Sequence, residues 1–397
     1  MPRARQARGD THNFGRHVSV GARLVKKPRT VFWEWLVLGN DSPLRRVLSE
    51  LAEHDGFGQD AFAFLPTLRV RRSRLAGEVE RLQIAPLGRL SAPGKRELAV
   101  AVGRSLALFS WLGVADLHWE NLALGRGAEG QVIFAPLDIE IALSDLASPT
   151  ETKLLPDVDP DYAAICRHAA GVRRILPYLG KPIQGPALVE MADSYLALLG
   201  LLERNRAVLA RTIAAAPGFS EAPIRVCLRG TGEYVLASSV PPSPPLLDAE
   251  VEQLTRGDIP YFFRLYGQPG IRWFANRALT ATKSLPLRGD VPKLEPLLSV
   301  TRGFRSPARK RLAEAGLFAV LGAFDHPALR GRHEGPRISV IFGARRLTVT
   351  VGGETLSAPR ELSALVGSVY LPCRCGEVRS VLVPPVTRCR AIVRARS

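Results

Sequence analysis

The residues best suited to chemistry form one short polar stretch, Asp116-Leu-His118-Trp-Glu-Asn121, and a second, Asp138-Ile-Glu140, which follows in an apolar run. Phosphoryl transfer requires a carboxylate beside the attacking hydroxyl and oxygen ligands for a hard cation such as Mg²⁺. Asp116 suits the first role, and Asn121 and Asp138 suit the second. The spacing therefore predicts a kinase-like site for ATP and Mg²⁺.

A helix, a loop and a strand are expected to position these residues. Residues 96–111 are mostly apolar and predict a buried helix that stops at Gly113, where glycine suits a helix end. Residues 131–143 predict a buried strand with Pro136 at its bend or end. The polar loop alone is also ordinary turn chemistry. The acidic pair in the apolar strand favours a functional site, because buried carboxylates need a partner.

A second polar group lies at the N-terminus, where Gly9-Asp10-Thr-His12-Asn-Phe-Gly15 precedes the basic cluster Val25-Lys-Lys27-Pro28-Arg29. Alternating short segments predict a small sheet over residues 18–37. A lysine on such a sheet can pair with nucleotide phosphates, and Lys27 is the candidate. The alternative is a solvated basic terminus without a site.

Four motifs in this order resemble the dehydratase domain of class II lanthipeptide (lantibiotic) synthetases. They are Gly9-Asp10-x-His12-Asn-x-Gly15, Val25-Lys-Lys27-Pro28-Arg29, Ala115-Asp116-Leu-His118-x-Glu-Asn121 and Leu137-Asp138-Ile-Glu140. A fifth, Leu254-x-x-Gly257-Asp258-Ile259-Pro260-Tyr261-Phe262, extends the likeness over roughly residues 9–263, with weakly matched stretches between the motifs.

The resemblance implies an α+β, kinase-like fold with two lobes, related to lipid kinases. It also implies ATP- and Mg²⁺-dependent phosphorylation of Ser and Thr in a precursor peptide, followed by elimination of the phosphate, in lanthipeptide biosynthesis. The residues carried over are Asp116 and His118 as catalytic residues, Lys27, Asp10 and His12 as cofactor-binding residues, and Asn121, Asp138 and Glu140 as metal ligands.

One departure bears on elimination. The family carries a Thr after the Asp-Ile-Pro-Tyr-Phe segment, where this chain has Phe263 and then Arg264. A phenyl ring cannot donate a hydroxyl hydrogen bond to a departing phosphate, although Arg256 and Arg264 could bind phosphate. We therefore expect a retained phosphopeptide. We also expect a stand-alone or reduced dehydratase without the zinc-binding cyclase domain, with a separate cyclase as partner, or alternatively a degenerate copy.

Length and composition predict several domains. At 397 residues and 46% hydrophobic, the chain can bury more than one core. We expect a small lobe over 1–90, a helical large lobe over 91–240, a dehydratase-like segment over 241–300 after a Pro-rich linker at 241–245, and a basic α/β region over 301–397. Helix-like spacing marks 157–179 and 186–215, a helix is expected just before Gly257, and residues 337–353 predict a hairpin.

The charge is strongly basic. The net charge is +17, and residues 301–397 contribute +11 of it, from 17 Lys and Arg against 6 Asp and Glu. Without a zinc finger or an aromatic RNA-binding motif, coding bias toward Arg is favoured over nucleic-acid binding. The N-terminus lacks an apolar signal core, and no uncharged run approaches the ~20 residues that cross a bilayer. We expect a cytoplasmic protein without a membrane span.

The five cysteines do not predict a disulfide framework. Cys166 and Cys227 are expected to be packed thiols. Cys373, Cys375 and Cys389 would need a fourth zinc ligand such as His326 or His333, and free thiols are favoured instead.

Three other functions remain open. A small-molecule kinase of the aminoglycoside type uses a similar Asp-to-Asn spacing, but lacks the Asp10-x-His12 signature. A non-catalytic peptide-binding dehydratase homologue would tolerate Asp138→Asn. A nucleic-acid binder built on the basic C-terminal quarter would ignore ATP and lose affinity steeply with salt.

Overall fold

The computed structural model describes residues 6–73, 76–144, 149–155, 170–180, 183–237, 239, 242, 245–285, 316–318, 320–326 and 328–360. In this part of the chain, helices combine with antiparallel sheets of five, four, four and two strands. The expected α+β class is confirmed at this level.

The N-terminal sheet has five antiparallel strands in the order β1-β2-β3-β5-β4. They are β1 (Gln6–His12), β2 (Arg16–Val20), β3 (Leu24–Lys27), β4 (Val70–Arg72) and β5 (Gly77–Glu80). Helices α1 (Phe32–Leu38) and α2 (Pro43–His54) lie between β3 and β4 in sequence. The prediction of a sheet over 18–37 is therefore wrong from residue 32 onward, where the chain forms α1. All seven side chains of α1 are buried, and such a continuous apolar run does not distinguish helix from strand.

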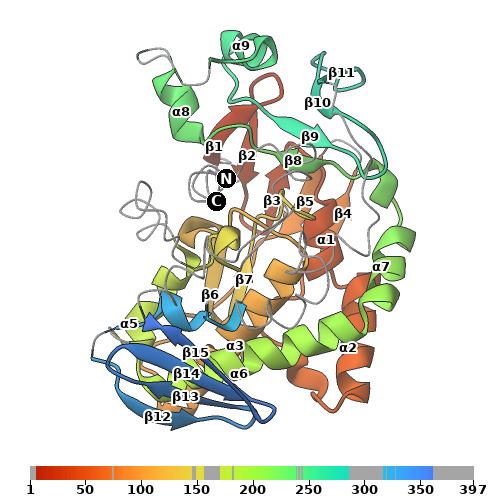
Figure 1. Ribbon diagram of the computed structural model, residues 1–397. Helices are drawn as coiled ribbons and strands as arrows, with labels where there is room; N and C mark the ends of the chain where they lie inside the picture. Colours follow the sequence, from red (N-terminus) through yellow and green to blue (C-terminus); the bar gives the residue numbers. More distant parts are fainter. Residues whose placement is uncertain are drawn as a thin grey trace.

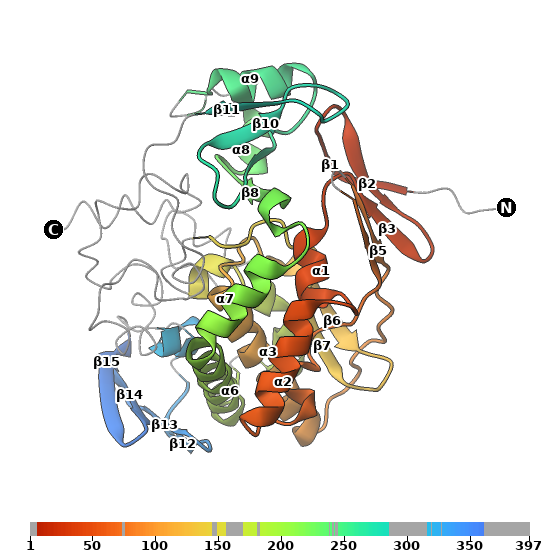
Figure 2. The same cartoon turned by 90° about the vertical axis from the view of Figure 1, so that its right-hand side faces the viewer.

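Two long helices, α3 (Ala92–Trp111) and α6 (Gly185–Arg204), pack together at the centre of the molecule (Figures 1 and 2). The Ser91 hydroxyl accepts a hydrogen bond from the Gly94 N–H at the start of α3. Gly113, with a φ of +63°, follows its end as expected. The helices approach closely at Gly103, where a Cβ would lie 2.2 Å from the Met191 carbonyl oxygen.

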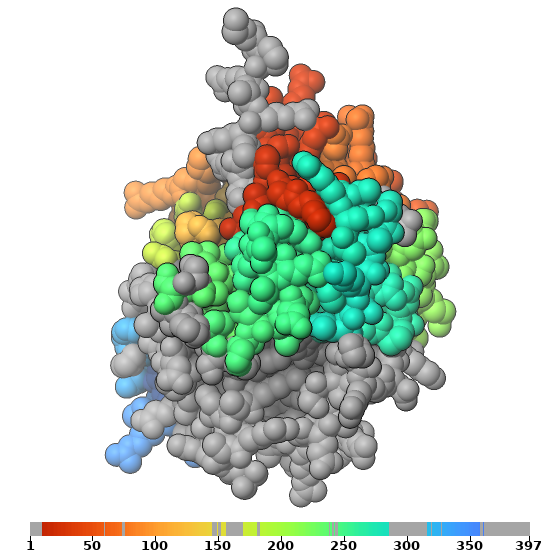
Figure 3. Space-filling view, turned by 90° about the horizontal axis from the view of Figure 1, so that it is seen from above, coloured from red at the N-terminus to blue at the C-terminus, as the bar shows by residue number. Residues whose placement is uncertain are grey.

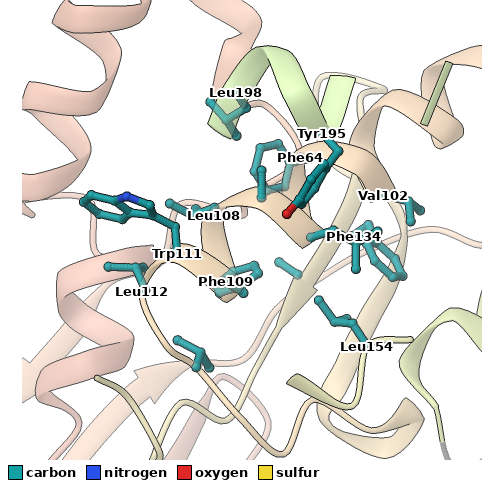
Figure 4. Packing of buried hydrophobic residues seen from close by; sticks show 14 of the residues in the cluster. Phe64, Val102, Leu108, Phe109, Trp111, Leu112, Phe134, Leu154, Tyr195 and Leu198 are labelled. Carbon is teal, nitrogen blue, oxygen red and sulfur yellow. The ribbon is translucent and has the colours of Figure 1, made fainter. Parts of the chain in front are cut away.

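The core beside α3 is rich in aromatic side chains. Phe109 and Trp111 of α3, Phe134 of β7 (Val132–Pro136) and Tyr195 of α6 are all buried there (Figure 4). β7 forms a hairpin with β6 (Leu122–Arg126). The Ser105 hydroxyl donates a hydrogen bond of 2.5 Å to the Phe134 carbonyl. This hydrogen bond joins β7 to α3. The loop after α3 and the segment after β7 therefore begin from elements that pack together.

Asp138 and Glu140 lie just after β7 rather than within a strand, which corrects the expectation of a strand through residue 143. Pro136 is the last residue of β7, one of the two positions expected for it. Ile139 and Ile141 are nevertheless buried, which accounts for the apolar run. The backbone of this segment bonds instead to neighbouring loops and strands, as described below.

The third sheet has the order β11-β10-β9-β8. Its strands are β8 (Ile224–Val226), β9 (Phe262–Arg264), β10 (Ile271–Phe274) and β11 (Thr282–Leu285), and the helices between β8 and β9 are α8 (Thr231–Leu236) and α9 (Asp248–Thr255). The helix expected before Gly257 is confirmed as α9. Figures 1 and 2 show this unit at the end of the molecule where β1 and β2 lie.

The fourth sheet lies at the opposite end and packs on α6. Its strands, in order, are β12 (Gly331–Glu334), β13 (Ile338–Phe342), β14 (Arg346–Val351) and β15 (Glu354–Pro359). The expected hairpin is confirmed as β13 and β14. The helix-like spacing over 186–215 corresponds to two helices, α6 and then α7 (Arg206–Ala215).

The remaining described helices are short. One is α5 (Leu176–Leu179). The others are 3₁₀ turns at Gln59–Phe62, Trp119–Asn121, Pro149–Thr152, Gly171–Ile175 and Phe219–Glu221. Residues 157–169 of one expected helix, most of the Pro-rich linker, and Cys166, Cys373, Cys375 and Cys389 lie outside the described residues.

Among the described helices, α6 is the one long and apolar enough to cross a membrane by length and composition. Within its most apolar window, 67% is buried in the molecule, and its Asp193 carboxylate accepts the Arg337 N–H at 2.9 Å. A core helix passes the same test of length and apolarity. The described residues thus contain no clear membrane span.

Candidate functional site

Lys27, at the end of β3, lies in a buried charge cluster that draws on three parts of the chain. Its ammonium donates to the Glu34 carboxylate of α1 at 2.8 Å, to Asp138 Oδ1 at 2.6 Å and to the Leu137 carbonyl at 3.0 Å. Glu34 is fully buried. The structure therefore joins the predicted lysine to the predicted Asp138 through a strand, a helix and a loop.

Arg29 is the centre of the same cluster. Its guanidinium donates to Glu140 Oε1 at 2.7 Å and to Glu34 Oε1 at 2.5 Å, and also bonds to Asp138 Oδ1. Burial disfavours the charge, but the three carboxylates outweigh it and raise the pKa of Arg29 above its usual value. Arg29 thus fixes the positions of all three acidic side chains.

Glu140 is held by two arginines. Its Oε1 accepts from Arg29, and its Oε2 accepts from Arg225 of β8 at 2.9 Å. The Arg225 N–H also donates to the Glu140 carbonyl at 3.0 Å. Both carboxylate oxygens are thereby engaged, so Glu140 anchors arginines in this structure.

Asp138 is ionised in this setting. Burial opposes ionisation, but the positive charges of Lys27, Arg29 and Arg225 hold the pKa of Asp138 well below its usual range. Among the described residues, none donates a hydrogen bond to its second oxygen, Oδ2. That oxygen is the one available to a ligand.

The loop after α3 carries Asp116 and Asn121 side by side. The Asn121 Nδ2 donates to the Asp116 carbonyl at 2.9 Å, and this bond braces Asp116 at a φ of +65°. Non-glycine residues at positive φ are concentrated at functional sites. The Asp116 carboxylate pairs with Lys153 at 2.8 Å.

Backbone hydrogen bonds tie this loop to the segment that carries Asp138. The Leu137 N–H donates to the Asn121 carbonyl at 2.8 Å, and the Ala115 N–H donates to the Ile141 carbonyl at 3.1 Å. These contacts lie on either side of Asp138. The structure therefore brings together both acidic stretches that the sequence singled out.

His118 has a structural contact. Its Nδ1 accepts the Glu120 N–H at 3.3 Å and starts the 3₁₀ turn Trp119–Asn121. The ring is partly exposed beside the loop, so it shapes the turn that presents Asn121.

His12 and Asp10 of β1 have different surroundings. His12 Nδ1 donates to the Ile259 carbonyl at 2.7 Å; because a carbonyl only accepts, the proton sits on Nδ1 and Nε2 is the basic nitrogen. Burial, followed by the charge of Arg225, lowers the pKa of His12. Asp10 is exposed and has no described contact with the charge cluster.

The first and last motifs of the resemblance form one structural unit. The Asp258 carboxylate, which is 1% exposed, accepts the N–H groups of Phe14 and Gly15 at 2.7 and 2.8 Å, although these residues lie some 244 positions away in sequence. Figure 3 shows the red N-terminal segment against the green and teal segments that follow β8. Asn13, Phe14 and Gly15 all have positive φ, and the bonds to Asp258 stabilise this tight turn.

The residues relevant to elimination pack against other parts of the protein. Phe263 is buried in an aromatic cluster with Tyr261 and Phe274. Arg256 is bound to Asp258 at 2.7 Å and lies over the Phe14 ring. Arg264 donates to the Leu143 carbonyl at 2.6 Å. Both arginines thus have structural contacts in this structure.

The predicted metal ligands fit Mg²⁺ in part. Asn121 Oδ1 and Asp138 Oδ2 accept no hydrogen bond from the described residues, and carboxylate and amide oxygens are suitable ligands for this ion. Glu140 differs, because arginines occupy both of its oxygens. Within the described ranges, no group of three or more His, Cys, Asp or Glu side chains is placed to hold a metal ion.

Cys227, His326 and His333 do not add a site. Cys227 is a free thiol beside the buried Ala115 and Ile141, and burial raises its pKa. His326 accepts the Ala328 N–H at 3.1 Å, and His333 packs on Phe342.

Sequence reasoning missed Glu34, Arg29 and Arg225. Glu34 carried a detectable signal, as an acidic residue in the apolar run Phe-Trp-Glu-Trp-Leu. Arg29 stood inside a quoted motif without an assigned role. Arg225 had no local signal, because it meets Glu140 from 85 positions away.

Comparisons with known proteins do not assign this chain to a family. No protein-family model matches it, and no curated protein matches it. Its function therefore has to be argued from the site.

Proposed function

We propose that this protein is an ATP- and Mg²⁺-dependent phosphotransferase of the lanthipeptide dehydratase type, which phosphorylates Ser and Thr hydroxyls of a precursor peptide. The observation that carries the proposal is the Lys27–Glu34–Asp138 arrangement, with ammonium-to-oxygen distances of 2.8 and 2.6 Å. A strand lysine paired with a helix glutamate, next to a metal-binding aspartate, is what kinase-like sites require.

The roles of the residues follow from their contacts. When bound, MgATP supplies the phosphoryl group and the metal charge. Asn121 and Asp138 would hold the metal, and Asp116 would accept the proton of the substrate hydroxyl. The Lys27 ammonium, whose three donors are directed at Glu34, Asp138 and the Leu137 carbonyl, would turn one of them to a nucleotide phosphate. Lys153, 2.8 Å from Asp116 Oδ1, orients that carboxylate. His118 shapes the loop rather than reacting.

A peptide substrate is favoured over a small molecule. The Asp10-x-His12 motif, which aminoglycoside-type kinases lack, is docked on the Asp258 segment by two hydrogen bonds from Phe14 and Gly15. That pairing of the first and fifth motifs supports the resemblance as a whole, including a kinase-like two-lobed arrangement. A cytoplasmic location and a separate cyclase as partner belong to the same proposal.

The product is a phosphopeptide rather than a dehydrated peptide. Phe263 stands where the family carries a Thr, and its ring packs against Phe274 with centroids 4.9 Å apart. No hydroxyl is supplied at this position to assist a departing phosphate.

Mass spectrometry tests the proposal. Precursor-like peptides rich in Ser and Thr are incubated with the protein, ATP and Mg²⁺. The expected result is a mass gain of one phosphate per modified residue. Loss of water as the main product would contradict the retained phosphate, and unmodified peptides together with phosphorylated aminoglycosides would favour the small-molecule kinase.

A further inference from the structure

Arg225 reaches the candidate site from β8, a strand that no motif of the sequence marks. One terminal nitrogen of its guanidinium donates to Glu140 Oε2 at 2.9 Å, and its side chain is 17% exposed. In the part of the chain that the structure describes, its Nε and second terminal nitrogen donate no hydrogen bond. This half-buried guanidinium thus has N–H donors that no described residue uses, and it is partly open to solvent.

The surroundings of Arg225 place it toward Asp116. Its backbone N–H donates to the Glu140 carbonyl at 3.0 Å, and the Ala115 N–H donates to the next carbonyl, that of Ile141, at 3.1 Å. Cys227, two residues further along the chain, packs against Ala115 and Ile141. Arg225 therefore reaches the acidic cluster from the side of the Asp116 loop, whereas Lys27 reaches it from β3 and donates to Asp138 and to Glu34 of α1.

We propose that Arg225 is a second phosphate-binding side chain, which contacts the terminal phosphate of the nucleotide, and that Glu140 is a positioning residue that orients it. This assignment rests on the proposed phosphotransferase function. A planar guanidinium with free N–H donors matches phosphate oxygens in a way that a surface lysine does not. In the proposed function Asp116 lies beside the reacting hydroxyl, and the terminal phosphate must lie next to that hydroxyl. A cation on the same side is therefore closest to the terminal phosphate.

A comparison of two nucleotides separates this role from a structural one. Calorimetry with Mg²⁺ and either ADP or a non-hydrolysable ATP analogue measures both affinities for the wild type, Arg225→Gln and Arg225→Lys. We expect Arg225→Gln to lower the affinity for the ATP analogue about 10- to 100-fold, which is the effect of losing one charged hydrogen bond. The affinity for ADP should stay within about 3-fold of the wild-type value. Arg225→Lys should recover part of the loss.

The control is Arg211→Gln, which removes the same charge from an exposed position on α7 and should bind both nucleotides as the wild type does. If Arg225→Gln alone unfolds, the double variant Arg225→Gln/Glu140→Gln also removes the carboxylate charge that Arg225 no longer balances. Its affinity for the ATP analogue should still be no higher than its affinity for ADP.

Two results would overturn the assignment. Unchanged affinity for both nucleotides in Arg225→Gln, or in the folded double variant, would show that the guanidinium contacts no phosphate. An equal loss of affinity for ADP and for the ATP analogue would show that the guanidinium does not contact the terminal phosphate. A folded wild type that binds neither nucleotide overturns the proposed function itself, which is a different outcome.

Discussion

Lys27 shows how a residue can be a candidate from the sequence while one of its partners is not. A lysine at the end of a short basic segment was a visible candidate, and its ammonium does meet Asp138 at 2.6 Å. Glu34, its partner at 2.8 Å, was hidden because the residues around it predict only burial. The cluster depends on tertiary contacts among β3, α1 and the segment after β7, which no local spacing encodes.

Replacement of Lys27 by Met should strongly lower the rate of phosphotransfer and also destabilise the protein. Removal of one positioned donor typically lowers turnover by on the order of 100-fold or more. The variant also leaves Glu34 and Asp138 with Arg29 alone, and loss of a buried partner costs on the order of 3 kcal/mol. Turnover assays and urea unfolding measure the two effects.

Lys26→Met is the matched control on the same strand. Its ammonium is 41% exposed and pairs with Glu78, and a surface pair of this kind contributes roughly 0–1 kcal/mol. Turnover by Lys26→Met should equal that of the wild type. Equal activity of the two lysine variants would remove Lys27 from the site.

His12 should make the protein less stable as the pH falls. Burial and then the charge of Arg225 lower its folded-state pKa below the usual 6.5, so the unfolded chain binds a proton more readily than the folded one. The stability from neutral His12 is complete above pH 6.5 and is lost as the pH falls below it. The free energy of urea unfolding, measured from about pH 7.5 down to about pH 5, reports this loss.

His12→Gln provides the comparison for this pH dependence. Glutamine keeps an N–H donor for the Ile259 carbonyl but does not titrate in this range. The variant should show a flatter fall in unfolding free energy over the same pH interval. Parallel curves for the two proteins would show that His12 contributes nothing to the slope.

At the scale of elements, α3, α9 and the β13–β14 hairpin could be predicted because their signals are local. α3 has a long apolar pattern and a stop at Gly113, although it begins at Ala92 rather than at residue 96. α1 could not be predicted, because burial on every side removes the periodicity that identifies a helix. The contact between Asp258 and the Phe14 turn spans some 244 positions, so only the tertiary fold brings those motifs together.

The packing of α3 against α6 predicts opposite effects at two glycines. A methyl group at Gly103 would collide with the Met191 carbonyl at 2.2 Å, so Gly103→Ala should destabilise by about 1–3 kcal/mol. At Gly200 of α6 the nearest atom is the flexible end of Arg204 at 3.2 Å. There alanine should stabilise by up to about 1 kcal/mol through its helix propensity.

Thermal unfolding of the two variants checks this prediction. A lower melting temperature for Gly103→Ala, beside an equal or higher one for Gly200→Ala, is the expected pattern. If both variants were stabilised, the close approach of α3 and α6 at Gly103 would be wrong.

Within the described residues, an extended core supports the site from below, and smaller clusters, such as that of Tyr261, Phe263 and Phe274, lie apart from it. A single cluster of buried apolar residues extends from Val31, before α1, to Val349 of β14, and the sheets lie around the central helices (Figure 2). The basic C-terminal region is partly engaged within the fold: Arg337 pairs with Asp193 and Arg360 with Asp325. Part of the positive charge that the sequence placed there thus serves internal pairing.

The proposed function depends on the binding of a nucleotide and its metal at Asp138. Calorimetric titration of MgATP into the wild type, Asp138→Ala and the exposed control Asp248→Ala tests it most directly, with circular dichroism to confirm that each is folded. We expect saturable binding by the wild type and the control, and loss of that binding in Asp138→Ala. A folded wild type that does not bind MgATP, or an Asp138→Ala variant that binds it equally well, would show that Asp138 holds no nucleotide-bound metal.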